Sequence, residues 1–169
     1  MPGKKKIQKK KKPKSAKKKK PSQPAIVEDD FDTIIERVLA ILQIEHEEDA
    51  DATDDNMNKY LAYLQQHFQI PCLVTGREDF DWEEYYLLGP GDKAEYAEMK
   101  KIHPSYTDKF EVLEIANHPD AMYGILVKVR RTSDKKIFVL PLGDLETVGK
   151  ESESTQLLDD YAVWFTNFR

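Results

Sequence analysis

The segment GREDFDWEEYYLLGPGD, residues 76–92, combines six carboxylates with four aromatic rings. Carboxylates are stable in water or beside a cation, whereas aromatic rings favour burial. Calcium binds six to eight oxygen atoms, so a calcium site needs several acidic side chains and backbone carbonyls on a segment that can bend. Two segments have this composition, residues 45–55 and residues 78–84. Runs of acids also occur on solvated surfaces, and that interpretation suits 45–55 better because aromatic residues interrupt 78–84.

Neither segment has the spacing of an EF-hand loop. In an EF-hand the sixth loop position is glycine and the twelfth is a glutamate that binds through both oxygens. A loop that starts at Asp49 has Asp54 in place of the glycine and Tyr60 in place of the glutamate. A loop that starts at Asp79 also lacks the glycine and ends on Pro90. Any calcium site in this chain must therefore use another scaffold.

The sequence EEYYLL at 83–88 predicts a short strand that follows a loop. Side chains alternate along a strand, so Glu84 would face one side of the sheet and Glu83 the other. The preceding loop would bring three acids together at the rim of the sheet: Glu78, Asp79 and Asp81. Arg77 can neutralise one of them, and the repulsion that is left favours a bound cation.

Motifs of the common enzyme classes are absent from the sequence. It has neither a glycine-rich phosphate loop nor a serine in a nucleophile elbow. The four histidines lie far apart, and none has a zinc-site spacing to the single cysteine, Cys72. Paired acids also suit glycosidases, which use one carboxylate as acid and another as base or nucleophile, but nothing marks out such a pair here. We therefore predict that the protein is not an enzyme.

Charge divides the chain into two parts. Residues 1–24 hold twelve lysines and no acid, so the rest of the chain carries 14 of the 26 basic residues and all 31 acidic ones. A lysine-rich tail over 1–27 is expected to be disordered, and it suits either weak contact with nucleic acid or simple solubilisation. The acidic part should repel nucleic acid and anionic membranes, and attract cations or basic partners.

The single cysteine allows no internal disulfide. The N-terminal region lacks the apolar stretch of a signal peptide, and no window reaches the length of a membrane span. We expect a soluble protein of the cytoplasm without membrane contact.

Periodicity predicts helices on both sides of a sheet, in one α+β domain over 28–169. Apolar residues at spacings of three and four predict three helices: 29–44, 55–68 and 154–168. About five short, largely antiparallel strands are expected in the sheet region 70–148, with a short helix at 92–101. Three consecutive strands followed by LPLGDLE suit a small SH3-like barrel. The apolar stripe of the last helix would cover one end of the sheet or form a dimer interface.

From residue 60 to residue 148 the chain resembles the cyanobacterial-type calcium-binding protein family (CcbP-like). The resemblance lies in YLAYLQQHFQIPCLVTG, then GPGD, and then FEVLEI, ILVKVRR and IFVLPLGDLE. Members of that family are small and acidic, with a helix, a short barrel-like sheet and a strand end of the type VPL-x-x-LE. The residues that match this ending are Leu140, Pro141, Leu142, Leu145 and Glu146. The insertion EYAEMKKIHPSYTDK is longer than expected for the family.

The resemblance implies reversible calcium binding through surface carboxylates, as a buffer or sensor without catalysis. Individual ligands are not carried over from the family, so carboxylate clustering selects the candidates. The predicted metal ligands are Glu78, Asp79, Asp81, Glu83 and Glu84, with Asp144 and Glu146 contributed from the end of the barrel.

A different interpretation is a non-enzymatic interaction module, in which an SH3-like barrel with an aromatic and acidic groove binds a basic or proline-rich protein. Its contact residues would be Trp82, Tyr85, Tyr86 and Tyr106, although packing in the core accounts for Trp82 equally well. A third interpretation is association with nucleic acid through the lysine-rich tail alone.

Overall fold

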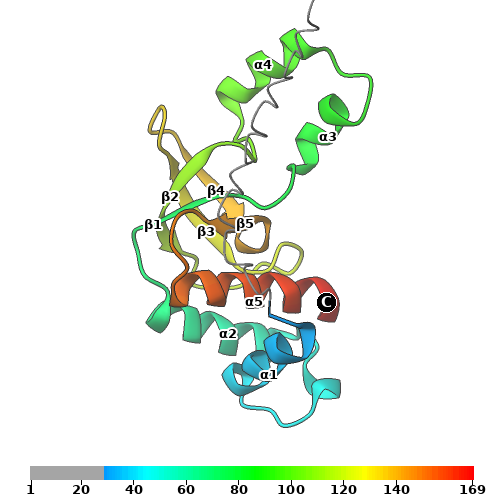
Figure 1. Cartoon of the computed structure of the whole chain (residues 1–169), viewed down its shortest axis with the longest axis vertical. Helices are drawn as coiled ribbons and strands as arrows, with labels where there is room; N and C mark the ends of the chain where they lie inside the picture. Colours follow the sequence, from blue (N-terminus) through cyan, green and yellow to red (C-terminus); the bar gives the residue numbers. More distant parts are fainter. Residues whose placement is uncertain (1–28) are drawn as a thin grey trace, which may run out of the picture.

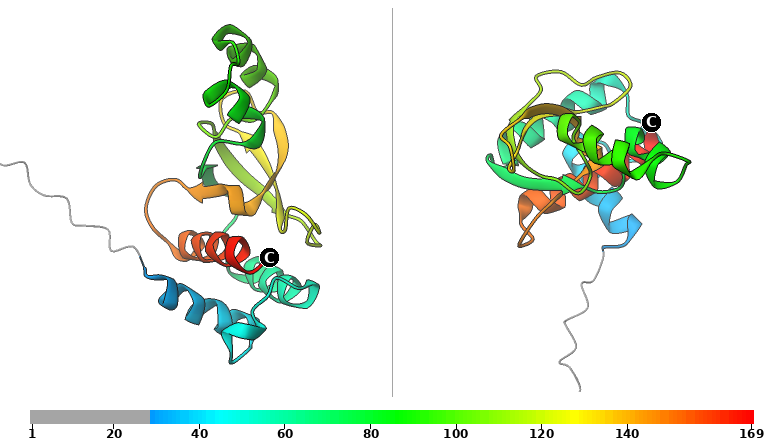
Figure 2. Two further views of the ribbon diagram at one scale, coloured as in Figure 1. Left: turned by 90° about the vertical axis from the view of Figure 1, so that its right-hand side faces the viewer. Right: turned by 90° about the horizontal axis from the view of Figure 1, so that it is seen from above.

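The computed structural model describes residues 29–169, and the predicted disordered tail, 1–27, lies outside these residues. The elements form three parts that are stacked along the long axis of the molecule (Figure 1). One end is the helix pair α3–α4, the middle is a β-sheet, and the other end consists of α1, α2 and α5 (Figure 2). In chain order the elements are α1 (Phe31–Leu42), η1 (Glu47–Asp49), α2 (Asp54–His67), β1 (Cys72–Gly76), α3 (Asp81–Leu87), α4 (Lys93–Ile102), β2 (Lys109–Ile115), β3 (Leu126–Arg131), β4 (Ile137–Pro141), η2 (Leu142–Asp144), β5 (Leu145–Thr147) and α5 (Glu153–Phe168).

The five strands form one antiparallel sheet in the order β4-β3-β2-β1-β5. The predicted α+β class and the three long helices are therefore confirmed. The SH3-like barrel is not confirmed, because β4 and β5 lie at opposite edges of an open sheet. A physical reason is that β5 has only three residues before the chain turns toward α5, which leaves too short an edge to close a barrel.

The apolar stripe of α5 packs into the core of this same chain. Tyr161 and Trp164 are fully buried, and the ring of Tyr60 from α2 lies 5.3 to 5.4 Å from both of them. Their polar atoms also have partners, since Trp164 Nε1 donates to the carbonyl of Ala50 at 2.7 Å and Tyr60 Oη to that of Leu157 at 2.8 Å. Ala50 belongs to the acid-rich segment 45–55, so this hydrogen bond attaches the segment to α5.

Helix α1 is joined to α5 by a two-pronged ion pair. Arg37 donates from Nε and Nη2 to the two carboxylate oxygens of Asp160, at 2.7 and 2.6 Å. Asp160 is almost completely buried, so this pairing compensates the loss of hydration of its carboxylate. None of the helices in residues 29–169 has the length and apolar character needed to cross a bilayer.

The segment 83–88 is part of helix α3, so the predicted strand is wrong. The helix is favoured over a strand because three acids occupy its first turn, where the helix dipole stabilises negative charge. Glu83 also accepts the backbone N–H of Phe80 at 3.2 Å, the reciprocal contact of a capping box. The short helix predicted at 92–101 is confirmed as α4, which begins after Asp92 accepts two backbone N–H groups.

A buried arginine attaches α4 to the sheet. Arg131 on β3 is 3% exposed and donates to the carbonyls of Lys100, Lys101 and His103 at the end of α4. The same guanidinium contacts the carboxylates of Asp108 and Asp134 at 3.0 and 2.7 Å. A cation is favoured at the C-terminus of a helix, where backbone carbonyls lack partners.

We expect Arg131→Met to lower the free energy of unfolding by about 3 kcal/mol, because it removes a buried cation that donates to three backbone carbonyls at the end of α4 and pairs with two carboxylates. Urea denaturation followed by circular dichroism measures the change. The neighbouring Arg130 is half-buried and pairs with Glu111 at 3.1 Å, so Arg130→Met serves as a control with an expected loss below about 1 kcal/mol. Equal losses in the two variants would contradict the role assigned to Arg131.

Candidate metal site

A pocket of about 440 Å³ is lined by the start of α3, by η2 and by the end of α5. We call it the acidic pocket, after the five carboxylates that line it: Glu78, Asp79, Asp81, Glu84 and Asp144. Four of them precede or begin α3, and the fifth comes from η2, more than fifty residues later in the chain. The structure thus places five of the seven predicted metal ligands around one pocket.

Backbone contacts hold the two contributing segments together. The N–H of Arg77 donates to the carbonyl of Asp144 at 2.8 Å, and that of Gly76 donates to the carbonyl of Tyr106 at 2.9 Å. A Cβ atom on Gly76 would lie 2.5 Å from the backbone of Tyr106, so only glycine permits this approach. Phe80 is buried in the core and fastens the other end of the loop.

The helical geometry of α3 separates its acids into two groups. Asp81 and Glu84 are three positions apart and exposed, so they share the face that lines the acidic pocket. Glu83 points the other way and is 0% exposed. Sequence reasoning had grouped Glu83 with the surface ligands because it lies within the same cluster of carboxylates along the chain.

The carboxylate of Glu83 is the centre of a buried hydrogen-bond network. Its Oε2 accepts the N–H groups of Phe80 and Tyr106 at 3.2 and 2.9 Å. Its Oε1 accepts the hydroxyls of Ser105 and Tyr96 at 2.6 and 2.8 Å. Burial, and then the bond to Glu83, raise the pKa of Tyr96 to about 12, so this hydroxyl is a donor at neutral pH. Because Glu83 is committed to four donors, we leave it out of the proposed ligand set.

The carboxylate of Asp144 is close enough to Asp81 and Glu78 for their charges to affect its ionisation. Burial raises the pKa of its carboxyl above the ordinary value, and the charges of Asp81 and Glu78 raise it further, while Arg169 opposes them. Like charges that lack a counter-ion disfavour ionisation in this way. A bound cation would remove this penalty.

The donor set of the acidic pocket suits a hard cation. Thr166 and Asn167 of α5 add side-chain oxygens to the five carboxylates, and sequence reasoning missed both because they lie in a helix assigned to packing. Asn167 donates its side-chain N–H to the carbonyl of Val163 at 2.7 Å, which leaves the amide oxygen as the part that can act as a ligand. Within residues 29–169 no three acidic, histidine or cysteine side chains already converge at metal-binding distance. Binding would thus require small movements of the lining side chains.

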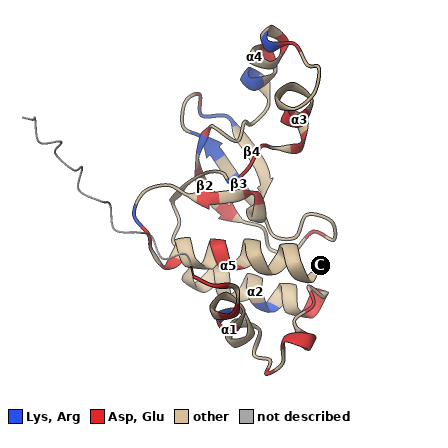
Figure 3. Ribbon diagram, turned by 45° about the vertical axis from the view of Figure 1, so that its right-hand side comes forward, with Lys and Arg blue, Asp and Glu red and all other residues tan. Residues whose placement is uncertain are grey.

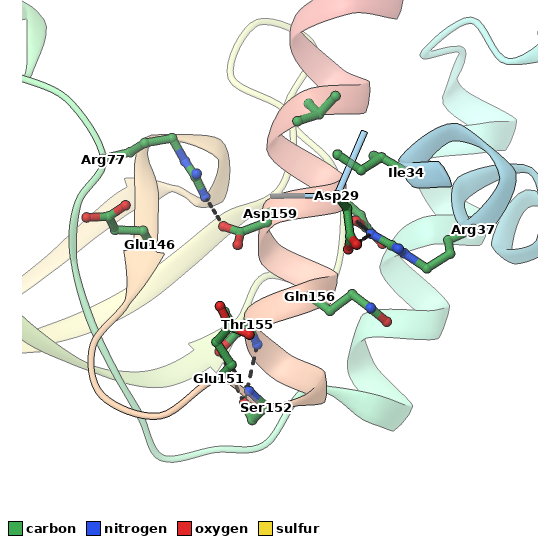
Figure 4. Close-up of a pocket in the computed structure, with 12 residues that line it drawn as sticks. Asp29, Ile34, Arg37, Arg77, Glu146, Glu151, Ser152, Thr155, Gln156 and Asp159 are labelled. Carbon is green, nitrogen blue, oxygen red and sulfur yellow. Dashed lines mark hydrogen bonds and ion pairs between the residues drawn. The ribbon is translucent and has the colours of Figure 1, made fainter. Parts of the chain in front are cut away.

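Glu146 lies in a different pocket, of about 730 Å³, which we call the mixed-charge pocket (Figure 4). Its two arginines are already paired with acids of α5. Arg77 Nη2 contacts Asp159 at 2.6 Å, and Arg37 contacts Asp160. Asp159 and Asp160 of this pocket therefore have counter-ions within the chain, whereas the five acids of the acidic pocket form no ion pair among the described residues.

The aromatic residues proposed as partner contacts have separate surroundings. Trp82 is half-buried, donates from Nε1 to the carbonyl of Pro104 at 2.7 Å and packs against rings of α3 and α4. Tyr86 stacks on Tyr96 at 5.2 Å, and Tyr106 packs against the core. Of the four, Tyr85 alone is classed as exposed, so the structure does not form one groove from all of them.

Comparison with known proteins gives one family and two similar structures. The model of the CcbP family, described by the words "calcium binding", matches residues 78–165. The crystal structure of Anabaena CcbP is similar with a TM-score of 0.51 and 17% identity, over 83% of this chain and 94% of that one. A structure described as a calcium binding protein in the calcium-binding form has a TM-score of 0.53 and 14% identity, over 85% and 96%. No curated protein matches the chain. At these identities the two structures support the fold, while the family match covers α3 and most of the candidate site.

We expect Glu83→Met to lower the free energy of unfolding by about 3 kcal/mol, since two backbone N–H groups lose their only acceptor. Glu83→Gln should cost only about 1 kcal/mol. The amide oxygen can face the two N–H groups while the two hydroxyls rotate to accept from the amide nitrogen. Urea denaturation measures both values, and Glu84→Met, on the exposed face of α3, should change stability by less than about 0.5 kcal/mol. A loss in Glu83→Gln as large as in Glu83→Met would contradict this network.

The raised pKa of Asp144 predicts a stability that falls as the pH rises. The folded protein holds this proton more tightly than the unfolded chain does, so the cost of ionisation is fully present at neutral pH and absent below the ordinary value of 3.8. In the presence of a chelator, Asp144→Asn should therefore raise the urea midpoint at neutral pH and leave it unchanged below pH 3.8.

Asp120→Asn is the control of opposite sign. Backbone N–H groups of Tyr123 and Met122 lower the pKa of Asp120, so this substitution should lower the midpoint at neutral pH. If Asp144→Asn and the wild-type protein showed the same pH dependence, the electrostatic account of Asp144 would be wrong.

Proposed function

The chain belongs to the CcbP family of calcium-binding proteins, and from this premise we propose that it binds calcium in the acidic pocket. The proposed ligands are Glu78, Asp79, Asp81, Glu84 and Asp144, with Thr166 and Asn167 as neutral oxygen donors. The observation that carries the proposal is that the segment 78–84 and Asp144, which are distant in the sequence, line one pocket. Burial, and then the charges of Asp81 and Glu78, raise the pKa of Asp144.

We assign the calcium site to the acidic pocket, the smaller of the two, because of how the acids in each pocket are paired. In the mixed-charge pocket the best-placed acids are paired with Arg37 and Arg77, so a cation would have to displace an arginine. In the acidic pocket a cation would neutralise charges that otherwise repel one another. Carboxylate, hydroxyl and amide oxygens are also the donors that calcium prefers, and the short loop before α3 can adjust to the irregular geometry that calcium accepts.

Calcium in this pocket would supply charge neutralisation and a link between α3 and η2. Ligand that binds only the folded state stabilises it, by about 2.7 kcal/mol at a hundredfold excess over Kd. The described residues that line the acidic pocket supply oxygen ligands for calcium, and no catalytic constellation was identified beside them. We therefore propose a calcium buffer or sensor rather than an enzyme. Because the ligands do not converge beforehand, part of the binding energy is used to order them, and we expect affinity below that of a preformed site.

The test of the proposed site is a calcium titration by calorimetry on the wild-type chain and on single variants. Asp81→Asn and Glu84→Gln each remove one charge from the acidic pocket and should weaken calcium binding about tenfold, or ~1.4 kcal/mol. Glu146→Gln removes a charge from the mixed-charge pocket and should leave the affinity unchanged. Equal weakening in all three variants would point to a diffuse charge effect and exclude this site.

Calcium should also raise the melting temperature more than the same concentration of magnesium does. Magnesium demands a near-octahedral arrangement and gives up its water reluctantly, whereas calcium accepts irregular oxygen ligands. Differential scanning fluorimetry at matched ionic strength measures both shifts. If neither ion shifts the melting temperature, the chain does not bind calcium under these conditions and the proposal fails.

A further inference from the structure

Helix α3 presents a row of two acids and two apolar side chains to solvent. Residues three and four apart lie on the same face of a helix, so Tyr85 and Leu88 continue the row that Asp81 and Glu84 begin. Tyr85 is 55% exposed and Leu88, which caps the helix, is 82% exposed. We call these four residues the α3 row.

The other side of α3 is held within the protein by three of its residues. Glu83 is bound by four donors, Trp82 packs against α4, and Tyr86 stacks on Tyr96. The orientation of the helix is thus set by the interior, and the exposure of Tyr85 and Leu88 is a consequence of that orientation. Large apolar side chains gathered on one exposed face commonly mark interaction surfaces.

We propose that the α3 row is a docking surface for a basic amphipathic segment of another protein, and that calcium and this segment compete for Asp81 and Glu84. Lysine or arginine side chains of the segment would pair with the two carboxylates, and its apolar side chains would cover Tyr85 and Leu88. Figure 3 shows acidic residues, in red, on α3. Asp81 and Glu84 also line the acidic pocket, so one pair of carboxylates serves both interactions.

Charge selects a basic partner over the other occupants. The chain after residue 24 carries 31 acids against 14 basic residues, so an acidic segment, a nucleic acid or an anionic membrane would be repelled. A second copy would bring the same acids to the same face, and like charges placed opposite one another are unfavourable. Residues 1–24 of the chain carry twelve lysines, but Ile7 is their only large apolar residue after Met1, so they supply the positive charge and not the apolar side chains. A basic helix with an apolar face supplies both.

Competition has a thermodynamic consequence that can be measured from either side. If saturating calcium lowers the affinity of the protein for the segment about tenfold, the segment must lower the affinity for calcium by the same factor. The competition depends on the proposed function, calcium binding in the acidic pocket. Docking of the segment on Tyr85 and Leu88 does not depend on it.

The experiment uses fluorescence anisotropy with the full chain and a labelled synthetic helix that carries lysines on one face and leucines on the other. A helix with glutamate in place of lysine is the peptide control. Leu88→Ser should weaken the lysine helix about tenfold, because it removes an exposed apolar contact and little else. Met122→Ser is the matched control, since Met122 is 69% exposed and lies outside the α3 row. Each titration is run with a chelator and again with calcium, and calorimetry records calcium binding to the same variants.

The proposal is supported if Leu88→Ser weakens the lysine helix, Met122→Ser does not, and calcium weakens the wild-type complex. It is overturned if Leu88→Ser binds the helix as the wild-type chain does. It is also overturned if the wild-type chain is a dimer by sedimentation and Leu88→Ser is a monomer, because a second copy then occupies the row. If calorimetry shows no calcium binding while Leu88→Ser still weakens the helix, the proposed function fails and docking survives. If calcium binds without affecting the helix, the shared use of Asp81 and Glu84 is wrong.

Discussion

A carboxylate removed from water needs hydrogen-bond donors on every side, and Glu83 obtains them from its own helix cap, from α4 and from the loop before β2. Rotating α3 about its axis would leave these donors and the carboxylate unpaired. The helix is therefore fixed in one orientation, and its other face must carry Asp81 and Glu84 outward. The position of the candidate metal ligands is in this sense a consequence of one buried acid that is not itself a ligand.

The acidic pocket also depends on how the helix pair α3–α4 is attached to the sheet. Arg131 holds the end of α4 against β3, and the contact between Arg77 and Asp144 joins the loop before α3 to η2. Together these contacts set the start of α3 over the acidic pocket, which the end of α5 lines from another side. The same arrangement explains why the chain keeps two kinds of acids. Asp159 and Asp160 of the mixed-charge pocket are paired with arginines of the chain, whereas burial and two neighbouring acids raise the pKa of Asp144 in the acidic pocket.

The sequence was sufficient for those features that depend on local periodicity or on composition. Spacings of three and four identify α1, α2 and α5, and alternating β-branched runs identify the hairpin strands β2 to β4. The excess of acid after the lysine-rich tail points to a cation, and the resemblance to CcbP agrees with the family match over 78–165. The strand at 83–88 was wrong because a short run of aromatic and apolar residues suits either period, and here the acids of the first turn favour the helix.

The sequence alone therefore determined the α+β class, the long helices and the acid-rich segment that supplies most of the candidate ligands, because these follow from patterns within a few residues. Tertiary structure alone decided which acids share a pocket. It buries Glu83 and places Glu146 in the pocket that Arg77 also lines. It also places Asn167, from the end of the chain, in the pocket that Asp81 lines. The physical reason is that the sequence around a carboxylate does not specify which group will neutralise it in the folded protein. Whether it meets an arginine, a set of N–H donors or another acid depends on contacts between segments that are distant along the chain.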